Sequence, residues 1–178
     1  MRIKLQFSLT VFVIFALFLA GCGNKESWAY IHDPKTEVLS LSDNGKAEYK
    51  GDNYSYTRDD KFLVLKDGNG NETKMRFIPD GDKMVLYESS TYTYDGEGEP
   101  DSILGVWTQD NGWLFEFTDK GTFTEENIFY GHYEVNEADH TIKLMYDEPM
   151  EDAILYYSLD GDKLMIDYPW PMVRTQKK

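Results

Sequence analysis

The chain repeats its own sequence at a spacing of about eighty residues. The sequence IPDGDKMVL at residues 78–86 returns as SLDGDKLMI at 158–166, and LSLSDNGK at 39–46 returns as FEFTDKGT at 115–122. Apolar positions match apolar positions in both pairs, which a chance similarity of turn sequences would not produce. We therefore expect two related halves that share one fold.

The alignment of the halves continues outside these segments and defines the domain boundaries. It pairs Trp28 with Trp107, Tyr54 and Tyr56 with Tyr133 and Val135, and Phe62 and Val64 with Ile142 and Leu144. Between the halves lies the sequence DGEGEPDS, whose glycine, proline and acidic residues are typical of a linker. The expected organisation is a first repeat at 27–94, a linker at 95–102 and a second repeat at 103–178.

Apolar residues alternate with polar ones at period two in both halves, and helical spacing is nowhere sustained. Phe115 and Phe117, for example, share one face of a predicted strand, with Glu116 and Thr118 on the other. The runs are separated by Asp-Gly and Asn-Gly sequences, which favour tight hairpin turns. This pattern predicts an all-β protein, an up-and-down antiparallel meander with about seven or eight short strands in each half.

The meander can close in two ways. Each half can form its own small barrel and fold alone, or both halves can form one larger pseudo-symmetric barrel. The number of strands in each half and the polar linker favour two small barrels. The interior of such a barrel has room for little more than its own side chains, here Trp113, Phe115, Phe117, Tyr133 and Tyr157.

The second half carries a further pattern: Gly105-x-Trp107, Phe115-x-Phe117-x-Asp119-x-Gly121-Thr122-Phe123, Gly131-x-Tyr133 and residues 158–164. It resembles the small lipocalin-like, calycin-type repeats of uncharacterised bacterial lipoproteins. The first half departs from the pattern, with Ser27-Trp28 in place of Gly-x-Trp. The resemblance implies an up-and-down β-barrel and no particular activity.

The N-terminus has the features of a secretory signal, with Arg2 and Lys4 before an apolar run that ends at Leu19. The following Ala20-Gly21-Cys22 completes a sequence that resembles the lipobox of bacterial lipoproteins. The resemblance implies removal of residues 1–21 and acylation of Cys22, the only cysteine, by diacylglycerol and a fatty acid such as palmitate. We therefore expect an extracytoplasmic protein that is anchored to the cell membrane through a short tether, residues 22–26.

The net charge restricts the partners. Removal of residues 1–21 takes away two basic residues and no acidic one, so the formal charge changes from −14 to −16. Such a surface repels nucleic acid and anionic lipid headgroups. The expected partners are the bilayer, reached through acylated Cys22, and a neutral glycan or a protein of the cell envelope.

One segment has the alternating oxygen ligands of a calcium loop, namely Asp67, Asn69 and Asn71. The sixth position of the loop is Glu72 where glycine is required, and the twelfth is Ile78, which has no oxygen ligand to offer. We therefore interpret the segment as a hairpin turn and expect neither a metal nor a cofactor. The three histidines show no metal-ligand spacing.

Sequence motifs of catalysis are missing, including a nucleophile elbow and a phosphate-binding glycine loop. We therefore expect a non-catalytic binding or interaction module. A structural accessory subunit of a cell-envelope complex is the first alternative, and an enzyme that acts on glycans is the second.

The aromatic residues supply the candidate ligand site. Trp170 lies between Pro169 and Pro171, so we expect it in a stiff loop at a barrel rim and not in a central strand. There it would either bind a ligand together with Tyr168 and Tyr156 or cap the open end of the barrel. Further tyrosines on the polar-facing positions of their predicted strands are Tyr87, Tyr92 and Tyr94.

Overall fold

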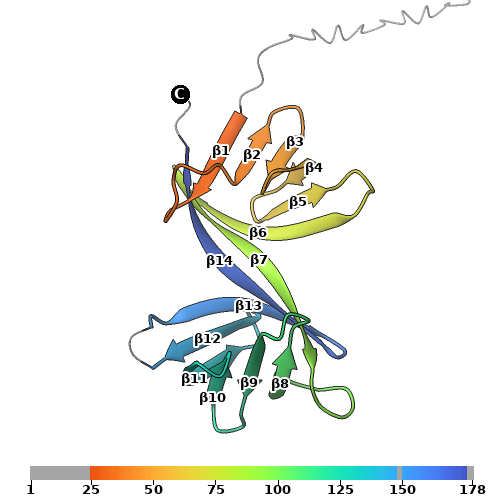
Figure 1. Ribbon diagram of the computed structural model, residues 1–178, viewed down its shortest axis with the longest axis vertical. Helices are drawn as coiled ribbons and strands as arrows, with labels where there is room; N and C mark the ends of the chain where they lie inside the picture. The colour runs from red at the N-terminus through yellow and green to blue at the C-terminus, as the bar shows by residue number, and fades with distance from the viewer. Residues whose placement is uncertain (1–24, 148–149, 176–178) are drawn as a thin grey trace, which may run out of the picture.

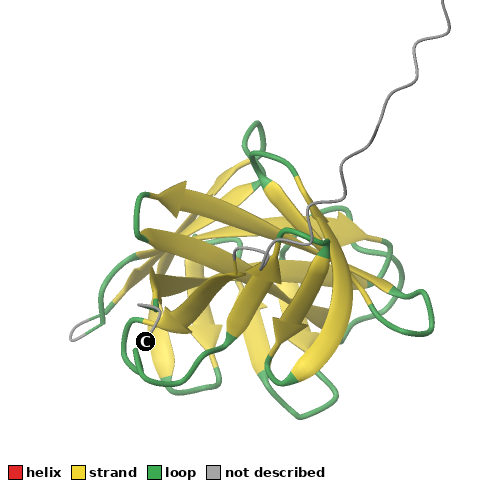
Figure 2. Ribbon diagram, turned by 90° about the horizontal axis from the view of Figure 1, so that it is seen from above, coloured by secondary structure: helices red, strands yellow, loops and turns green. Residues whose placement is uncertain are grey.

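The computed structural model describes residues 25–147 and 150–175, which form fourteen β-strands and, within these ranges, no helix (Figure 2). The strands of the first half are β1 Lys25–Tyr30, β2 Leu39–Ser42, β3 Lys46–Tyr49, β4 Asp52–Arg58, β5 Phe62–Lys66, β6 Glu72–Asp80 and β7 Lys83–Tyr94. Those of the second half are β8 Gly105–Thr108, β9 Leu114–Phe117, β10 Thr122–Glu125, β11 Phe129–Asn136, β12 Thr141–Tyr146, β13 Ala153–Asp160 and β14 Lys163–Arg174.

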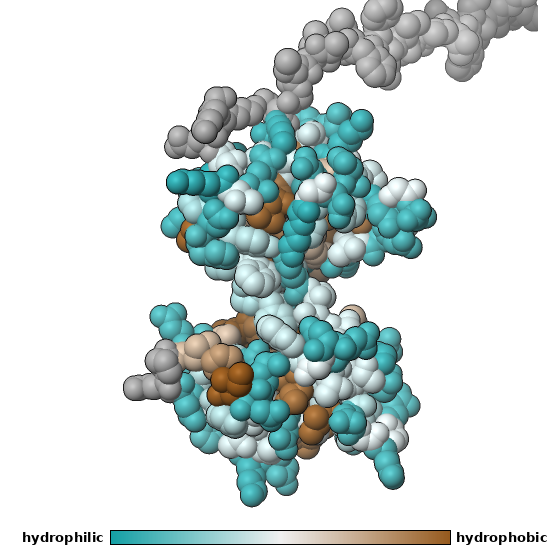
Figure 3. All heavy atoms as spheres, viewed as in Figure 1, coloured by the Kyte–Doolittle hydropathy of each residue, from teal (hydrophilic) through white to brown (hydrophobic). Residues whose placement is uncertain are grey.

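Every strand is the antiparallel neighbour of the next strand in the chain, and β1 pairs with β14 to close the ring. The predicted all-β antiparallel meander is therefore confirmed. The ring is not a regular barrel, because its two longest strands, β7 and β14, also pair with each other, from Lys163 opposite Thr93 to Val173 opposite Lys83. This pairing divides the ring into two lobes joined by a narrow waist (Figures 1 and 3).

The two long strands each serve both lobes. Strand β7 contributes Leu86 to the core of the first lobe and Tyr92 to the core of the second, whereas β14 contributes Ile166 to the second and Met172 to the first. The end of β14 pairs with β1, and the end of β7 pairs with β8. Each repeat thus completes the lobe of the other with the end of its last strand.

The chain crosses between the lobes inside β7 and β14, and not through the acidic segment 95–102. That segment connects β7 to β8 within the second lobe and is mostly exposed. Glycine, proline and acidic residues favour any exposed connection, so they do not distinguish a hairpin loop from a linker between domains. In the same way, the span 103–178 includes the end of β14, where Met172 packs in the first lobe.

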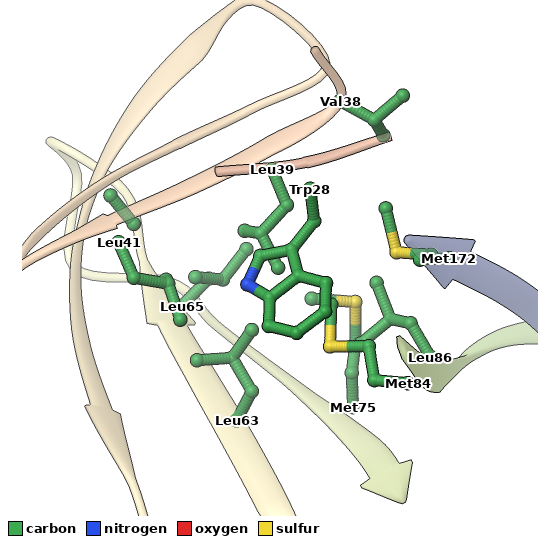
Figure 4. Close-up of a cluster of buried hydrophobic side chains, with 11 residues drawn as sticks. Trp28, Val38, Leu39, Leu41, Leu63, Leu65, Met75, Met84, Leu86 and Met172 are labelled. Atoms are coloured by element: carbon green, nitrogen blue, oxygen red, sulfur yellow. The ribbon is translucent and has the colours of Figure 1, made fainter. Parts of the chain in front are cut away.

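Each lobe has its own hydrophobic core. The buried residues of the first are Trp28, Val38, Leu39, Leu41, Ala47, Leu63, Leu65, Met75, Met84, Leu86 and Met172 (Figure 4). Those of the second are Tyr92, Ile103, Trp107, Phe115, Phe117, Phe123, Ile142, Leu144, Leu155, Leu164 and Ile166. These cores hold the lobes together because burial of apolar side chains is the main favourable term in folding.

The two repeats align in β5 with a shift of one residue from the sequence alignment. Leu63 is buried and lies opposite Met75, just as Ile142 is buried and lies opposite Leu155. A shift of one residue moves a side chain to the other face of a strand. The equivalents of Ile142 and Leu144 are therefore Leu63 and Leu65, and not Phe62 and Val64.

The sequence alignment is also shifted in β4, here by two residues, which keeps the side chains on the same face of the strand. The hydroxyl of Tyr56 donates a hydrogen bond to the carbonyl oxygen of Ser42 at 3.2 Å, and that of Tyr133 donates to the carbonyl oxygen of Thr118 at 2.8 Å. The equivalent of Tyr133 is therefore Tyr56, and not Tyr54.

The aromatic residues expected inside the second lobe are buried to different degrees. Phe115 and Phe117 are fully buried, and Tyr133 and Tyr157 pack partly buried against the same core. Trp113, in contrast, is 52% exposed. It precedes the first residue of β9, so the alternation of the strand does not extend to it. The expectation that Trp113 fills the interior is wrong.

Candidate functional site

The first lobe contains a cavity of about 300 Å³ that opens to solvent between charged side chains. Its walls are mainly apolar and come from Trp28, Leu39, Leu41, Leu63, Phe77, Pro79, Gly81, Met84 and Leu86. Its rim carries Glu26, Arg58, Asp59, Asp60 and Arg174. A small apolar space with a few polar groups is the usual form of a small-ligand site.

The cavity exists because the first lobe has smaller core residues than the second. Leu39 lies opposite Trp28 in the sheet, whereas the residue opposite Trp107 is Phe115. The next buried pair is Leu41 and Ala47 in the first lobe, and it is Phe117 and Phe123 in the second. Protein interiors are close-packed, so a lobe of similar strand layout with smaller side chains keeps unfilled space.

The indole of Trp28 is a buried hydrogen-bond donor without a partner. Trp28 is 4% exposed, it lines the cavity, and its Nε1 has no hydrogen-bond acceptor among the described residues. Figure 4 shows the indole nitrogen turned away from Met172. An unsatisfied buried donor costs about 1–3 kcal/mol of stability. The wall of the cavity therefore contains an unsatisfied hydrogen-bond donor.

The equivalent indole in the second lobe is satisfied by the chain itself. Trp107 Nε1 donates a hydrogen bond to the carbonyl oxygen of Ile103 at 2.7 Å. The side chain of Ile103 is only 5% exposed and belongs to the second core. The residues just before β8 thus cover Trp107 with both an aliphatic side chain and a main-chain acceptor.

This covering segment lies at the same end of its lobe as the cavity does in the first lobe. Ile103 and Leu104 border an open groove of about 730 Å³ together with Val135, Tyr157 and Leu159. By sheet register the last three are the equivalents of Arg58, Phe77 and Pro79, which line the cavity of the first lobe. Among the described residues, this end of the lobe is therefore covered by a segment of the chain in the second lobe and left open in the first.

The rim of the cavity is organised around Glu26. Arg58 binds its carboxylate through two hydrogen bonds, of 3.0 and 3.3 Å, and Arg174 lies 3.9 Å from the same carboxylate. The hydrogen bond from Arg58 and the charges of both arginines hold the pKa of Glu26 below its usual value, against the effect of burial. The Arg174 guanidinium also lies 4.9 Å from the centre of the Trp28 ring. The ion pairs thus fix the charged edge directly above the indole.

Trp170 lies within β14, opposite Leu86 of β7, and is 38% exposed. The expectation of a loop at a barrel rim is therefore wrong. Its ring centre lies 5.3 Å from that of Tyr30, which in turn stacks on His32 at 5.4 Å. Trp170 thus belongs to a partly exposed aromatic stack at the waist of the molecule.

The two prolines fit in β14 because they lie where its pairing with β13 has ended and its pairing with β1 is only beginning. The amide of Arg174 donates to Asp82 on the β7 side, so by alternation the nitrogens of Pro169 and Pro171 face away from β7. On that side β13 pairs only as far as Asp167, and β1 pairs only from Met172. Pro169 therefore removes no ladder hydrogen bond. Pro171 lies opposite Ile31, whose amide donates to the Pro171 carbonyl oxygen at 3.1 Å, and only the return bond of this last pair is missing.

The other two predicted ligand residues lie in different surroundings. The Tyr168 hydroxyl is 2.6 Å from the Tyr92 hydroxyl inside the second lobe. Tyr156 packs under the Arg76 guanidinium, 3.9 Å from the ring centre, and against Tyr87 at 5.2 Å. Tyr92 is 1% exposed and Tyr87 is also buried, so their expected polar-facing positions are wrong. Neither Tyr156 nor Tyr168 adds an exposed ring to the stack at Trp170.

The segment with calcium-like spacing forms the turn between β5 and β6. One carboxylate oxygen of Asp67 accepts hydrogen bonds from the amides of Asn69 and Asn71, and the other accepts one from the Asn71 side chain, all at 2.8 Å. The side-chain bond from Asn71 is the main cause that lowers the pKa of Asp67. These bonds use the carboxylate within its own turn. Among the described residues no group of three or more histidine, cysteine or acidic side chains is arranged to hold a metal.

The N-terminal predictions concern a part of the chain outside the described residues, since the signal sequence and Cys22 precede Lys25. The described residues contain no helix that is long and apolar enough to cross a bilayer. Comparisons with protein-family models, with curated proteins and with solved structures give no match for this chain.

The residue that defines the site, Trp28, was paired with Trp107 by the sequence alignment but not singled out as functional. The available signal was the change from FEF at 115–117 to LSL at 39–41 in otherwise similar segments. Two smaller residues beside an equivalent tryptophan indicate space next to an indole. The free N–H, however, depends on the contacts of each indole in the folded chain.

Proposed function

We propose that this protein is a membrane-anchored extracytoplasmic lipoprotein that acts as a non-catalytic binding module, with the cavity of the first lobe as its binding site. The anchor is inferred from the signal-like N-terminus and from Cys22. The binding role is inferred from the cavity.

A single observation carries the binding proposal. The Trp28 indole N–H is buried without an acceptor beside a cavity of about 300 Å³, while the equivalent Trp107 N–H is bonded. Buried polar groups in native proteins are nearly always satisfied, so an exception at a cavity points to a missing ligand. An apolar molecule that carries one acceptor would fill the space and satisfy the donor.

Cavity filling tests the site. The described strands and both cores lie within residues 25–175, so a chain that begins at Gly23 retains all of them. We expect it to bind the neutral fluorescent probe N-phenyl-1-naphthylamine. Leu41→Phe, which copies Phe117 of the second lobe, should weaken binding at least tenfold, whereas Ile154→Phe on the exposed face of β13 should not change it. If the Leu41→Phe protein binds the probe as tightly as the unchanged protein does, the cavity is not the binding site.

The anchor needs a separate test in the bacterial cell. The Cys22→Ala variant of the full chain should be released or remain unprocessed, because only a cysteine can receive the acyl group. Detergent phase partitioning measures this. A variant that partitions into detergent like the unchanged protein, with residues 1–21 removed, would contradict lipidation at Cys22.

A further inference from the structure

The second lobe contains a template for the occupant of the first. Just before β8, Ile103 places its side chain in the core and its carbonyl oxygen on the indole N–H of Trp107. The two tryptophans are equivalent, since each lies opposite the same register position on β2 or β9 and near the end of β14 or β7. The contacts of Ile103, a side chain in the core and a carbonyl oxygen on the indole N–H, therefore show how the unbonded N–H of Trp28 could be satisfied.

The first repeat does not carry the same residue in its own sequence. Ile103 precedes its tryptophan by four residues, and the residue four before Trp28 is Asn24, which follows Gly23. Neither has an aliphatic side chain that could fill an apolar cavity. Among the described residues none takes the place beside Trp28 that Ile103 takes beside Trp107, so this space is open to an aliphatic group of a partner.

We propose that the cavity of the first lobe binds a peptide segment of a partner protein, with a branched aliphatic side chain in the cavity and a main-chain carbonyl that accepts the Trp28 N–H. This inference rests on the proposed binding function and specifies its partner. The bound segment takes the place that Ser102–Leu104 takes in the second lobe.

The rim adds a preference for the flanking residues of the peptide. Arg58 and Arg174 are both engaged by Glu26, whereas the rim also carries the carboxylates of Asp59 and Asp60. The whole chain is strongly acidic. A segment with uncharged or basic residues on each side of its aliphatic residue is therefore favoured over an acidic one.

The chain supplies its own probe. The capped peptide acetyl-Ser-Ile-Leu-Gly-Val-amide copies residues 102–106, and the matched control has alanine in place of isoleucine. Titration calorimetry with the chain that begins at Gly23 should show binding of the isoleucine peptide at least tenfold tighter than the alanine peptide. Binding of both peptides with equal affinity, or of neither, overturns the inference.

Three variants locate the peptide. Trp28→Phe keeps an aromatic ring but removes the N–H and part of the indole, and it should weaken binding of the isoleucine peptide at least fivefold. Trp113→Phe on the exposed surface makes the same change and should have no effect. Leu41→Phe fills the cavity from within the described core, so it should also weaken binding of the isoleucine peptide. Unchanged affinity in both the Trp28→Phe and Leu41→Phe proteins overturns the proposal.

The failure of this inference can be separated from that of the proposed function. One outcome is that the probe N-phenyl-1-naphthylamine binds to the unchanged protein and more weakly to the Leu41→Phe protein while neither peptide binds. In that case the cavity is a site for a non-peptide ligand. If neither the probe nor the peptides bind, both proposals are wrong. A thermal melt of each variant shows whether a loss of binding reflects loss of the fold.

Discussion

Arg174 lies over the Trp28 ring, with its guanidinium 4.9 Å from the ring centre, so the last strand of the chain covers the core formed by the first. In the second lobe Tyr94 covers Trp107 in the same way, with 5.1 Å between ring centres. Each tryptophan is thus covered by the end of a long strand that begins in the other lobe. The repeats are joined by an exchange of strand ends, and not by a flexible linker.

The exchange predicts that neither repeat folds alone. A fragment of residues 102–178 lacks the end of β7, including the buried Tyr92, and leaves the edge of β8 unpaired. We expect it to be largely disordered by circular dichroism and to gain β-structure when mixed with residues 23–98. A cooperative thermal melt of the 102–178 fragment by itself would show that the strand exchange is dispensable.

The two equivalent tryptophans should respond differently to loss of the indole N–H. Trp107→Phe removes the bond to Ile103 and leaves a buried carbonyl unsatisfied, which costs about 1–3 kcal/mol beyond the change in size. Trp28→Phe removes a donor that has no partner, so its cost should be smaller by a similar amount. Urea denaturation of both variants measures the difference. Equal destabilisation would mean that Trp28 is bonded in solution.

Cavity filling should also affect stability. Leu41 lines the cavity, so Leu41→Phe adds volume where space exists, and we expect a gain of about 0.5–2 kcal/mol in the free energy of unfolding. Leu65 is the control, since it is buried in the same core but does not line the cavity. Leu65→Phe should cost about 1–3 kcal/mol through overpacking. Denaturant titration decides the sign, and a loss of stability in the Leu41→Phe protein would contradict the cavity.

Alkaline pH should destabilise the second lobe through Tyr92. Burial raises the pKa of Tyr92 from 10.0 to about 12, because the charged phenolate is disfavoured in the core. The stability that this neutral phenol contributes is complete below pH 10 and is lost as the pH rises towards 12. Tyr92→Phe should reduce the decline between pH 10 and 12, measured by denaturation at each pH. It should also lower stability at pH 7, because Tyr168 then loses its hydroxyl partner.

Trp170 should tolerate substitution better than a core tryptophan. It is partly exposed and packs on Tyr30, so Trp170→Ala should cost clearly less than the roughly 3–5 kcal/mol expected for Trp107→Ala. If its exposed ring binds a neutral glycan or an envelope protein, as the sequence suggested, the variant should lose that binding in a glycan or protein screen with little change in melting temperature. A loss of stability equal to that of Trp107→Ala would show a purely structural role.

The sequence by itself determined the features that depend on neighbouring residues. Alternation placed Phe115 and Phe117 on the buried face, and Asp160-Gly161 marked the turn between the last two strands, where Gly161 has a positive φ of 56°. The pattern also predicted the duplication, the antiparallel meander and the absence of helices in the part now described. These features are local, since the side chains of a strand alternate by geometry and a tight turn requires particular residues.

Only the tertiary structure decided which strands complete each lobe and where space remains. The pairing of β7 with β14 joins residues about eighty positions apart, and no local pattern specifies it. Whether Pro169 and Pro171 fit in a strand depends on where β13 and β1 stop pairing, which is again a property of the assembled sheet. The free N–H of Trp28 has the same origin: the equivalent N–H of Trp107 is bonded to Ile103, whereas that of Trp28 is buried without an acceptor in the wall of a cavity.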